Sequence, residues 1–415
     1  MYIKEHLENG IPVVMESFKN MRSVAVGVWI KVGSRYEKPE ENGISHFLEH
    51  MFFKGTKKRS TKDIAIEIDS IGGDLNAFTS RENTAFYIKV LDEHLETGID
   101  LLSDIFVHSL FPEDEIEKEK KIIKEEIKMV EDTPDDYIHD LFSHDVWGDE
   151  GLGQTILGRR ETIASFTREN LVSHIRKHYG TRDIVIACAG NFSHDDLIHT
   201  LGSSFGGLRH GSEPKAGPKP KFRQSVKIYT KDISEAHICI GVPSISQVSD
   251  ERYSLFVLNT ILGAGVSSRL FQEIREKRGL AYTVYSYTSS YIDTGLWGIY
   301  AGVSKKKVTE AVEVIIDEML ALKDTLTDAE LQRAKNHLKG NLILGLEATS
   351  SRMNNIARQE MYFGKYFSPD EIIKSVDKVS MDQIKELSER LIKKNLFSCT
   401  VYGPVQKNAL DGILA

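Results

Sequence analysis

A proline- and glycine-rich segment divides this 415-residue chain near its midpoint. Residues 207–224 contain three prolines, together with glycines and lysines but few apolar side chains. Such a composition is typical of a solvated, semi-extended linker. A chain of this length also exceeds the size at which one hydrophobic core keeps growing. We therefore predict two domains, residues 1–208 and 225–415, joined by a linker over residues 209–224.

The two halves repeat one pattern of strands and helices. In the first half, β-type runs at residues 11–15 and 24–32 read as a hairpin or meander, and a polar loop at 37–42 leads into a helix. A strand pair follows at 74–79 and 84–91, whereas 134–155 reads as a looser region. Long helices segregated from antiparallel strand pairs predict an α+β fold, with two homologous domains that each pack an antiparallel β-sheet with α-helices.

Residues 43–55, GISHFLEHMFFKG, carry the strongest chemical signal. In a helix, His46 and His50 lie one turn apart on one face, where two imidazoles can hold one Zn²⁺, and Glu49 projects beside them. The order His-x-x-Glu-His inverts the commoner zinc-protease motif. A short motif alone remains a hypothesis. The helix context supports it, because the apolar residues fall on the opposite stripe: Ile44, Phe47, Leu48 and Met51.

A catalytic zinc site needs a third protein ligand and an open position for water. The predicted helix over 112–131 has many carboxylates, and its apolar stripe, widened by Ile122, decides among them. Glu119 and Glu126 project on the buried flank, whereas Glu125 points towards solvent. Buried carboxylates must be paired or bind a metal. We predict Glu126 as the third ligand and Glu119 as a partner that orients a ligand or balances its charge.

Together these residues resemble the M16 metallopeptidases, the inverted-zincin group that includes the mitochondrial processing peptidases. The resemblance is carried by His46-Phe47-Leu48-Glu49-His50, by a glutamate 76 residues after His50, and by the segment Asn76-Ala77-Phe78-Thr79-Ser80. It is greatest to the short bacterial members. The resemblance implies that His46, His50 and Glu126 bind one zinc ion, that Glu49 is the general base, and that Glu119 supports the ligands.

The resemblance also assigns residues outside the metal helix. Asn76 and Ala77 are expected on an edge strand that pairs with a peptide. In the second half, IREKRGLAY at residues 274–282 is similar to the family's Arg and Tyr segment, so Arg275 and Tyr282 are expected to reach the site from the other domain. The zinc ligands themselves have no counterpart there: aligning the two halves places other residues opposite His46, Glu49 and His50, namely Phe256, Asn259 and Thr260.

The function implied is a zinc-dependent, processing-peptidase-like endopeptidase that hydrolyses extended or unstructured peptides. Two alternatives stay open. A non-catalytic M16-like scaffold would carry broken ligands, and a zinc-dependent peptide-binding module would not need Glu49. Family members that enclose their substrate do so with four such domains, so the resemblance implies that a chain of two dimerises, and we expect a homodimer because closed two-fold pairing is the commonest assembly. A heterodimer with an inactive homologue is the alternative.

Composition excludes several other classes. A net charge of −8 argues against a nucleic-acid partner. The three cysteines, Cys188, Cys239 and Cys399, lie in or beside apolar runs and read as core thiols of a reducing compartment. No apolar run of about 18 residues and no export-type N-terminal segment is evident. We therefore expect a cytoplasmic protein without a membrane partner.

Overall fold

The structure is a computed structural model that describes residues 1–211 and 219–413. The chain forms two compact units, each assembled from three segments. Unit 1 consists of Met1–Met129, Gln154–Pro218 and Gly345–Tyr366, and unit 2 consists of Val130–Gly153, Lys219–Leu344 and Phe367–Ala415. Each unit therefore takes a segment from the other half of the sequence. Part of the predicted linker, residues 212–218, lies outside the described residues.

Unit 1 is built on a six-stranded sheet in the order β1-β2-β6-β3-β5-β4. Its strands are β1 (Tyr2–His6), β2 (Pro12–Ser17), β3 (Ser23–Ile30), β4 (Asp74–Thr79), β5 (Thr84–Leu91) and β6 (Ile184–Gly190). Its helices, including the start of one that runs into unit 2, are α1 (Ile44–Met51), α2 (Thr61–Ser70), α3 (Leu95–His108), α4 (Glu113–Glu131), α6 (Arg160–Ser165), α7 (Arg168–His178), α8 (His194–Phe205) and α12 (Thr349–Phe363).

Unit 2 is built on a five-stranded sheet in the order β7-β11-β8-β10-β9. Its strands are β7 (Val226–Thr230), β8 (Ala236–Ser244), β9 (Ala281–Ser290), β10 (Gly295–Val303) and β11 (Ser398–Gly403). Its helices are α5 (Pro134–Trp147), α9 (Arg252–Gly263), the π-helical turn η5 (Phe271–Lys277), α10 (Val308–Thr325), α11 (Asp328–Gly345), α13 (Pro369–Asp377) and α14 (Met381–Leu391).

The α+β prediction is confirmed, and the two sheets share one topology. Apart from the extra strand β1, both have the same strand order, and the neighbouring strands run in the same relative directions. Neither sheet is purely antiparallel, because β2 pairs in parallel with β6 and β7 pairs in parallel with β11. The sheets are therefore mixed, with antiparallel pairs in the majority.

Two local predictions were wrong. The runs at 11–15 and 24–32 do not form a hairpin, because β6, which comes about 150 residues later in the chain, lies between β2 and β3. The looser region predicted at 134–155 contains the 14-residue helix α5. Apolar side chains from one face of α5 are buried against the sheet of unit 2: Ile138, Phe142, Val146 and Trp147.

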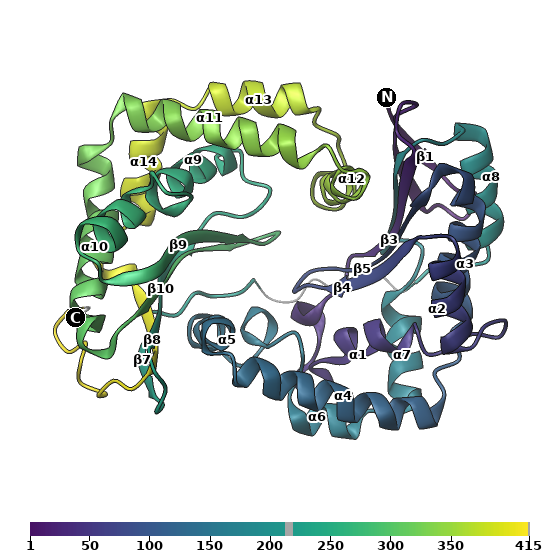
Figure 1. Ribbon diagram of the computed structural model, residues 1–415, viewed down its shortest axis with the longest axis horizontal. Coiled ribbons are helices and arrows are strands. Elements are labelled where there is room, and N and C mark those ends of the chain that lie inside the picture. Colours follow the sequence, from purple (N-terminus) through teal and green to yellow (C-terminus); the bar gives the residue numbers. More distant parts are fainter. Residues whose placement is uncertain (212–218, 414–415) are drawn as a thin grey trace. The chain divides into compact units, whose positions relative to one another are not determined.

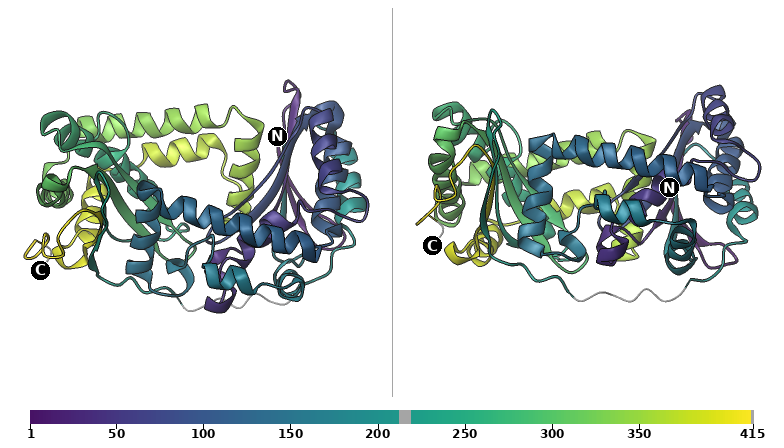
Figure 2. Two further views of the ribbon diagram at one scale, coloured as in Figure 1. Left: turned by 60° about the horizontal axis from the view of Figure 1, so that its bottom comes forward. Right: turned by 90° about the horizontal axis from the view of Figure 1, so that it is seen from below.

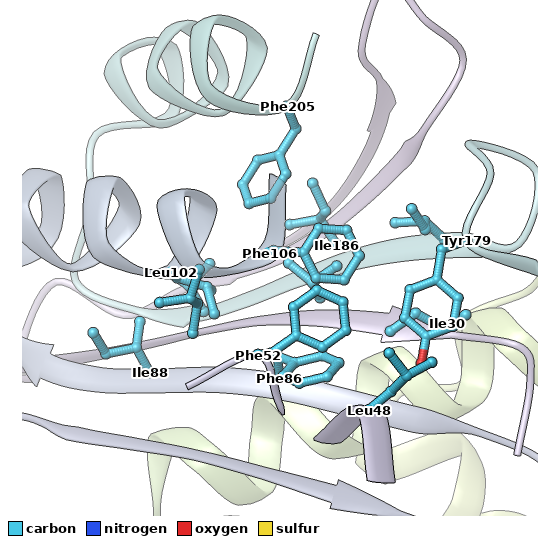
Figure 3. Close-up of a cluster of buried hydrophobic side chains, with 14 of the residues drawn as sticks. Ile30, Leu48, Phe52, Phe86, Ile88, Leu102, Phe106, Tyr179, Ile186 and Phe205 are labelled. Atoms are coloured by element: carbon cyan, nitrogen blue, oxygen red, sulfur yellow. The ribbon is translucent and has the colours of Figure 1, made fainter. Parts of the chain in front are cut away.

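The main core of unit 1 lies between one face of its sheet and helices including α1, α3 and α8. Phe52, just after α1, stacks on Phe106 of α3 and meets Phe86 of β5 edge-on. Figure 3 shows these rings together with Tyr179 and Phe205. The left view of Figure 2 shows the purple and blue strands of this sheet with helices against one side. This core fixes the position of α1.

The opposite face of each sheet is covered by a helix from the other half of the sequence. In unit 1, α12 packs on β2, β3 and β6, on the side of the sheet away from α3 and α8 (Figure 1). In unit 2, α5 packs on β8 and β11. All three cysteines are free and buried, in line with the core thiols predicted. None of the described helices is long and apolar enough to cross a membrane.

Candidate metal centre

Helix α1 carries three of the predicted site residues. It begins after Gly43, whose φ of 94° lies in the left-handed region, and it buries its apolar face in the core of unit 1. Glu49 and His50 lie on the other side and are partly exposed, whereas His46 is only 6% exposed. The helix is thus amphipathic, as its sequence pattern predicts, with the two imidazole rings 4.7 Å apart between centroids.

Helix α4 brings a carboxylate to the same place. The Glu126 Oε2 atom lies 3.7 Å from Nε2 of His46 and 3.7 Å from Nε2 of His50. These three ligand atoms all lie within 4.8 Å of one another. Glu125 is exposed, in agreement with the helix-face argument. That argument was wrong about Ile122, which is 50% exposed and does not extend the apolar stripe.

The donor set and its spacing fit a zinc ion. Zn–N and Zn–O bonds are about 2.0–2.2 Å long, so two ligand atoms of one ion lie no more than about 4.4 Å apart. Both Glu126–His separations, 3.7 Å, satisfy this limit, and the remaining separation, between the two histidines, lies within 4.8 Å. In the described part of the chain, the buried Oε2 atoms of Glu126 and Glu49 have no hydrogen-bond partner. Two imidazole nitrogens and one carboxylate also make up a known catalytic zinc set.

Glu119 lies about two helical turns before Glu126 on α4, and its carboxylate contacts Nδ1 of His50. Its Oε2 is 3.0 Å from His50 Nδ1, and Lys54 Nζ donates to its Oε1 at 2.6 Å. Glu119 is 1% exposed. Burial raises the pKa of Glu119, but the hydrogen bonds from His50 and Lys54 outweigh burial and hold it below its usual value. The ionised carboxylate accepts from Nδ1–H, so in the neutral form of His50 the lone pair lies on Nε2, the atom that faces Glu126.

Burial is the largest cause of the pKa shifts of His46, Glu49 and Glu126. It lowers the pKa of His46 to about 3, helped by the charge on His50, so His46 is a neutral donor. Burial likewise raises the pKa of Glu49 and of Glu126 above the usual carboxyl value. Desolvated carboxylates of this kind are stabilised by a nearby cation. The cluster therefore has the charge and the neutral imidazole that a divalent metal requires.

The edge of the sheet in unit 1 lies beside α1. Strand β4 is the last strand of the sheet, and α1 contacts it (Figure 1). Asn76 is exposed on β4, and its Oδ1 accepts a hydrogen bond from the backbone N–H of Ala77 at 2.8 Å. The predicted strand boundaries, 74–79 and 84–91, agree with β4 and β5. Asn76 and Ala77 thus lie on an edge strand next to the helix that carries His46, Glu49 and His50.

Arg275 and Tyr282 lie in unit 2. Arg275 is in the turn η5, and Tyr282 is on β9, the edge strand of the second sheet. The Arg275 guanidinium carbon lies 4.6 Å from the centroid of the Tyr282 ring, a cation–π pair, and Tyr282 is 78% exposed. The structure therefore brings these two residues together. Their action on the metal cluster of unit 1 remains a prediction.

Glu37 is a further residue at the site, although its sequence context predicts only a polar loop. Glu37 is 5% exposed, and its carboxylate accepts backbone N–H groups from the start of α1. Burial raises its pKa to about 7, against the lowering effect of these donors. A signal for it exists in the sequence: α1 begins at a glycine that has no side chain to cap it, so another residue must accept its first N–H groups.

An inverted His-x-x-Glu-His pair that faces a glutamate from a second helix is the arrangement of the inverted zinc proteases. Residues 12–160 match the insulinase family, peptidase family M16, and residues 165–338 match the peptidase M16 inactive domain. The chain belongs to peptidase family M16, a family of metallopeptidases. The two family matches meet near residue 160, within the first half of the sequence.

Relatives over nearly the full length are named zinc proteases. The chain is 44% identical to the uncharacterized zinc protease YmxG of Bacillus subtilis, covering 94% of this chain and 95% of that protein. It is 39% identical to the uncharacterized zinc protease SCO5738 of Streptomyces coelicolor, over 96% of this chain and 89% of that one. A solved structure titled peptidase M16 inactive domain, from Pseudomonas fluorescens, has the same fold: TM-score 0.91 at 18% identity, covering 98% of this chain and 99% of that one.

Proposed function

We propose that this protein is a zinc-dependent endopeptidase that hydrolyses peptide bonds in extended or unstructured peptides. The observation that carries the proposal is the position of Glu126 Oε2, 3.7 Å from Nε2 of both His46 and His50, with the buried, unpartnered carboxylate oxygen of Glu49 on the same helix. The names of the relatives support zinc as the metal. We propose one zinc ion per chain, because the described residues offer one such cluster.

Each residue of the cluster has a separate task in this proposal. His46, His50 and Glu126 would hold the ion, and Glu119 would keep the His50 ring oriented. A bound zinc ion would polarise the scissile carbonyl and acidify water. Glu49 takes the proton from the attacking water as general base and then delivers it to the nitrogen of the leaving amine. The raised pKa of Glu49, caused by burial, makes the protonated form of this carboxyl accessible for the second step.

The edge strand explains why the substrate should be extended. An unpaired strand edge binds any peptide in β-conformation through backbone hydrogen bonds, and side-chain pockets then give specificity. We propose that the peptide pairs with β4 at Asn76 and Ala77, beside α1. Folded proteins present few free extended segments, so unstructured peptides are the expected substrates. Arg275 and Tyr282 are proposed to hold substrate carbonyls or the developing oxyanion.

The biological setting is also a proposal. The resemblance to short processing-peptidase-like proteases supports a processing role, and the three free, buried cysteines support a reducing, cytoplasmic compartment. Two units per chain support a homodimer, with a heterodimer containing an inactive homologue as the alternative. Size-exclusion chromatography with light scattering on the isolated chain tests the assembly. A monomer with full activity would contradict the dimer.

The function is tested by comparing the wild type with Glu49→Gln on a panel of unstructured peptides, with zinc content measured for both. General-base catalysis contributes about 10²–10⁴-fold, so we expect a fall of that size in the rate of cleavage, with zinc content unchanged. Glu125→Gln, an exposed carboxylate on α4, is the matched control and should cleave normally.

Each other outcome selects an alternative. Full activity in Glu49→Gln would disprove the proposed base. A wild type that binds zinc and peptide without cleavage would be a zinc-dependent peptide-binding module. A wild type that binds no zinc and cleaves no peptide would be a non-catalytic M16-like scaffold.

A further inference from the structure

The start of the metal-binding helix is tied to one buried carboxylate. Glu37 lies between the short turns η1 (Ser34–Tyr36) and η2 (Pro39–Glu41). Its Oε2 accepts from the backbone N–H of Gly43 at 2.7 Å, and its Oε1 accepts from the backbone N–H of Ser45 at 2.8 Å. The Nδ2 atom of Asn42 donates to the same Oε2 at 3.1 Å. Both carboxylate oxygens of Glu37 are thus occupied at the entry to α1.

This helix needs such an anchor. The first N–H groups of any helix lack partners within the helix, and an acidic group near them also interacts favourably with the helix dipole. Gly43, at the N-cap of α1, provides no side-chain acceptor. The helix is only eight residues long, and short helices depend on contacts outside themselves to hold their ends. Glu37 therefore replaces the missing cap from six residues upstream.

The anchor is itself fixed to a second segment of unit 1. Gln154 Nε2 donates to the backbone oxygen of Glu37 at 3.1 Å, and Asn42 Nδ2 donates to the backbone oxygen of Thr155 at 2.9 Å. A Cβ atom on Gly43 would lie 2.6 Å from the Cα of Gly158. The entry to α1 is therefore packed backbone to backbone against this segment. It has little freedom to shift while Glu37 keeps its bonds.

The two histidines are held by different devices. His50 is oriented from behind by Glu119, which accepts from its Nδ1. His46 has no comparable acceptor in the described part of the chain, because its buried Nδ1 lacks a hydrogen-bond partner. The position of His46 therefore depends on the backbone of the first turn, and Ser45, its neighbour, is bonded directly to Glu37.

We propose that Glu37 is a positioning residue of the metal centre, which places the His46 imidazole by fixing the first turn of α1. The inference rests on the zinc site proposed above. Metal ligands must be held within about 0.5 Å of their productive positions to bind well. Loss of the Glu37 carboxylate releases the Gly43 and Ser45 N–H groups and lets the first turn move, whereas Glu119 still orients His50.

The test compares Glu37→Gln and Glu37→Asp with the exposed Glu40→Gln from the same loop. Zinc affinity is measured by competition with a chelator, and the visible absorption of the cobalt(II)-loaded protein reports the number and geometry of the ligands. Loss of a partner that orients a ligand costs about 10–100-fold in metal affinity, and we expect a loss in that range for Glu37→Gln. The cobalt spectrum should shift towards fewer protein ligands. Glu37→Asp should lie between Glu37→Gln and the wild type, and Glu40→Gln should match the wild type.

Two further measurements keep the outcome decisive. Circular dichroism of the metal-free proteins shows whether each variant folds, and Glu37→Asp carries the test if Glu37→Gln does not. Glu126→Gln identifies which claim fails. If Glu126→Gln binds zinc as the wild type does, the proposed metal site is wrong. If Glu126→Gln loses zinc while folded Glu37 variants keep wild-type affinity and the wild-type cobalt spectrum, the positioning role of Glu37 is overturned and the metal site stands.

Discussion

Units 1 and 2 have sheets of the same topology, but helix α1 of unit 1 and helix α9 of unit 2 differ in whether their polar side chains find hydrogen-bond partners. In unit 1, α1 presents Glu49 and two histidines, and the buried Glu49 Oε2 and His46 Nδ1 atoms lack hydrogen-bond partners among the described residues. In unit 2, Asn259 of α9, which the sequence alignment sets opposite Glu49, accepts a hydrogen bond from Trp297 Nε1 at 2.9 Å. Thr260, set opposite His50, donates to the backbone oxygen of Phe256 at 2.8 Å.

The comparison separates what a fold requires from what a site requires. Buried polar groups in proteins are almost always satisfied, and each exception needs an explanation. The polar side chains of α9 follow that rule within their own unit. Glu49 of α1 and Glu126 of α4 do not, and a metal ion with an attacking water would satisfy their buried Oε2 atoms. The unsatisfied carboxylate atoms of Glu49 and Glu126 beside the histidine pair, rather than the fold, therefore distinguish the proposed catalytic unit from its structural counterpart.

The largest loss of zinc affinity is expected at Glu126, the carboxylate of unit 1 that faces the histidine pair. Glu126→Gln removes one of three proposed ligands, and we expect zinc affinity to fall by more than about 100-fold, beyond the effect of losing an outer partner. Equilibrium competition with a chelator measures this. The neighbouring Glu125→Gln should leave affinity unchanged. If the two variants exchanged these results, the assignment of the α4 face would be wrong.

A smaller loss of zinc affinity is expected at Glu119, which contacts a proposed ligand and not the metal itself. Glu119→Gln weakens the acceptor of His50 Nδ1 and leaves Lys54 without its carboxylate partner. Loss of such a partner lowers metal affinity by about 10–100-fold. The same competition assay applies, with the exposed Glu117→Gln of the same helix as the control. Equal affinity in both variants would mean that Glu119 does not support the site.

The corresponding change in unit 2 should affect stability instead of metal binding. Asn259→Leu leaves the buried Trp297 Nε1 without its acceptor, and an unsatisfied buried donor costs about 1–3 kcal/mol. Urea unfolding should show this loss while zinc affinity stays at the wild-type value. A marked loss of zinc with unchanged stability would contradict the structural role given to α9.

The smallest effect is the difference in stability between two glycine substitutions, one in each sheet. A Cβ atom on Gly298 of β10 would lie 2.4 Å from the ring of Tyr287, whereas one on Gly27 of β3 would lie 2.9 Å from the flexible Met353 side chain and 3.0 Å from Nε1 of Trp29. Overpacking costs about 1–3 kcal/mol when the neighbour cannot move. Gly298→Ala should therefore destabilise more than Gly27→Ala in urea unfolding. The reverse order would mean that the α12 side of unit 1 is the more rigid of the two.

Local periodicity predicted the parts of the site that lie within single helices. The 3.6-residue pattern of α1 placed His46 and His50 on one face, and the pattern of α4 separated Glu126 from Glu125. Local periodicity failed where the burial of a side chain depends on a segment that is distant in sequence. Ile122 was placed in the core, but no described element covers that flank of α4 enough to bury it.

Non-local contacts account for the other misses. No local pattern shows that β6 enters between β2 and β3, or that α5 finds its apolar partner on the sheet of unit 2. Glu37 reads as a loop residue because its acceptor role depends on α1 starting without a cap and on the segment near Gln154 packing over it. The insertion of β6 and the docking of α5 depend on tertiary structure and leave no signal in local spacing, whereas for Glu37 the glycine at the start of α1 shows that an acceptor is needed but not which residue provides it.

The central claim is that one metal ion binds between α1 and α4 of unit 1. Anomalous X-ray scattering from crystals grown with zinc, recorded on both sides of the zinc absorption edge, tests it most directly. The account predicts one strong peak per chain within bonding distance of His46 Nε2, His50 Nε2 and a Glu126 carboxylate oxygen. A zinc-saturated crystal with no peak between these atoms, or with its only strong peak in unit 2, would contradict it.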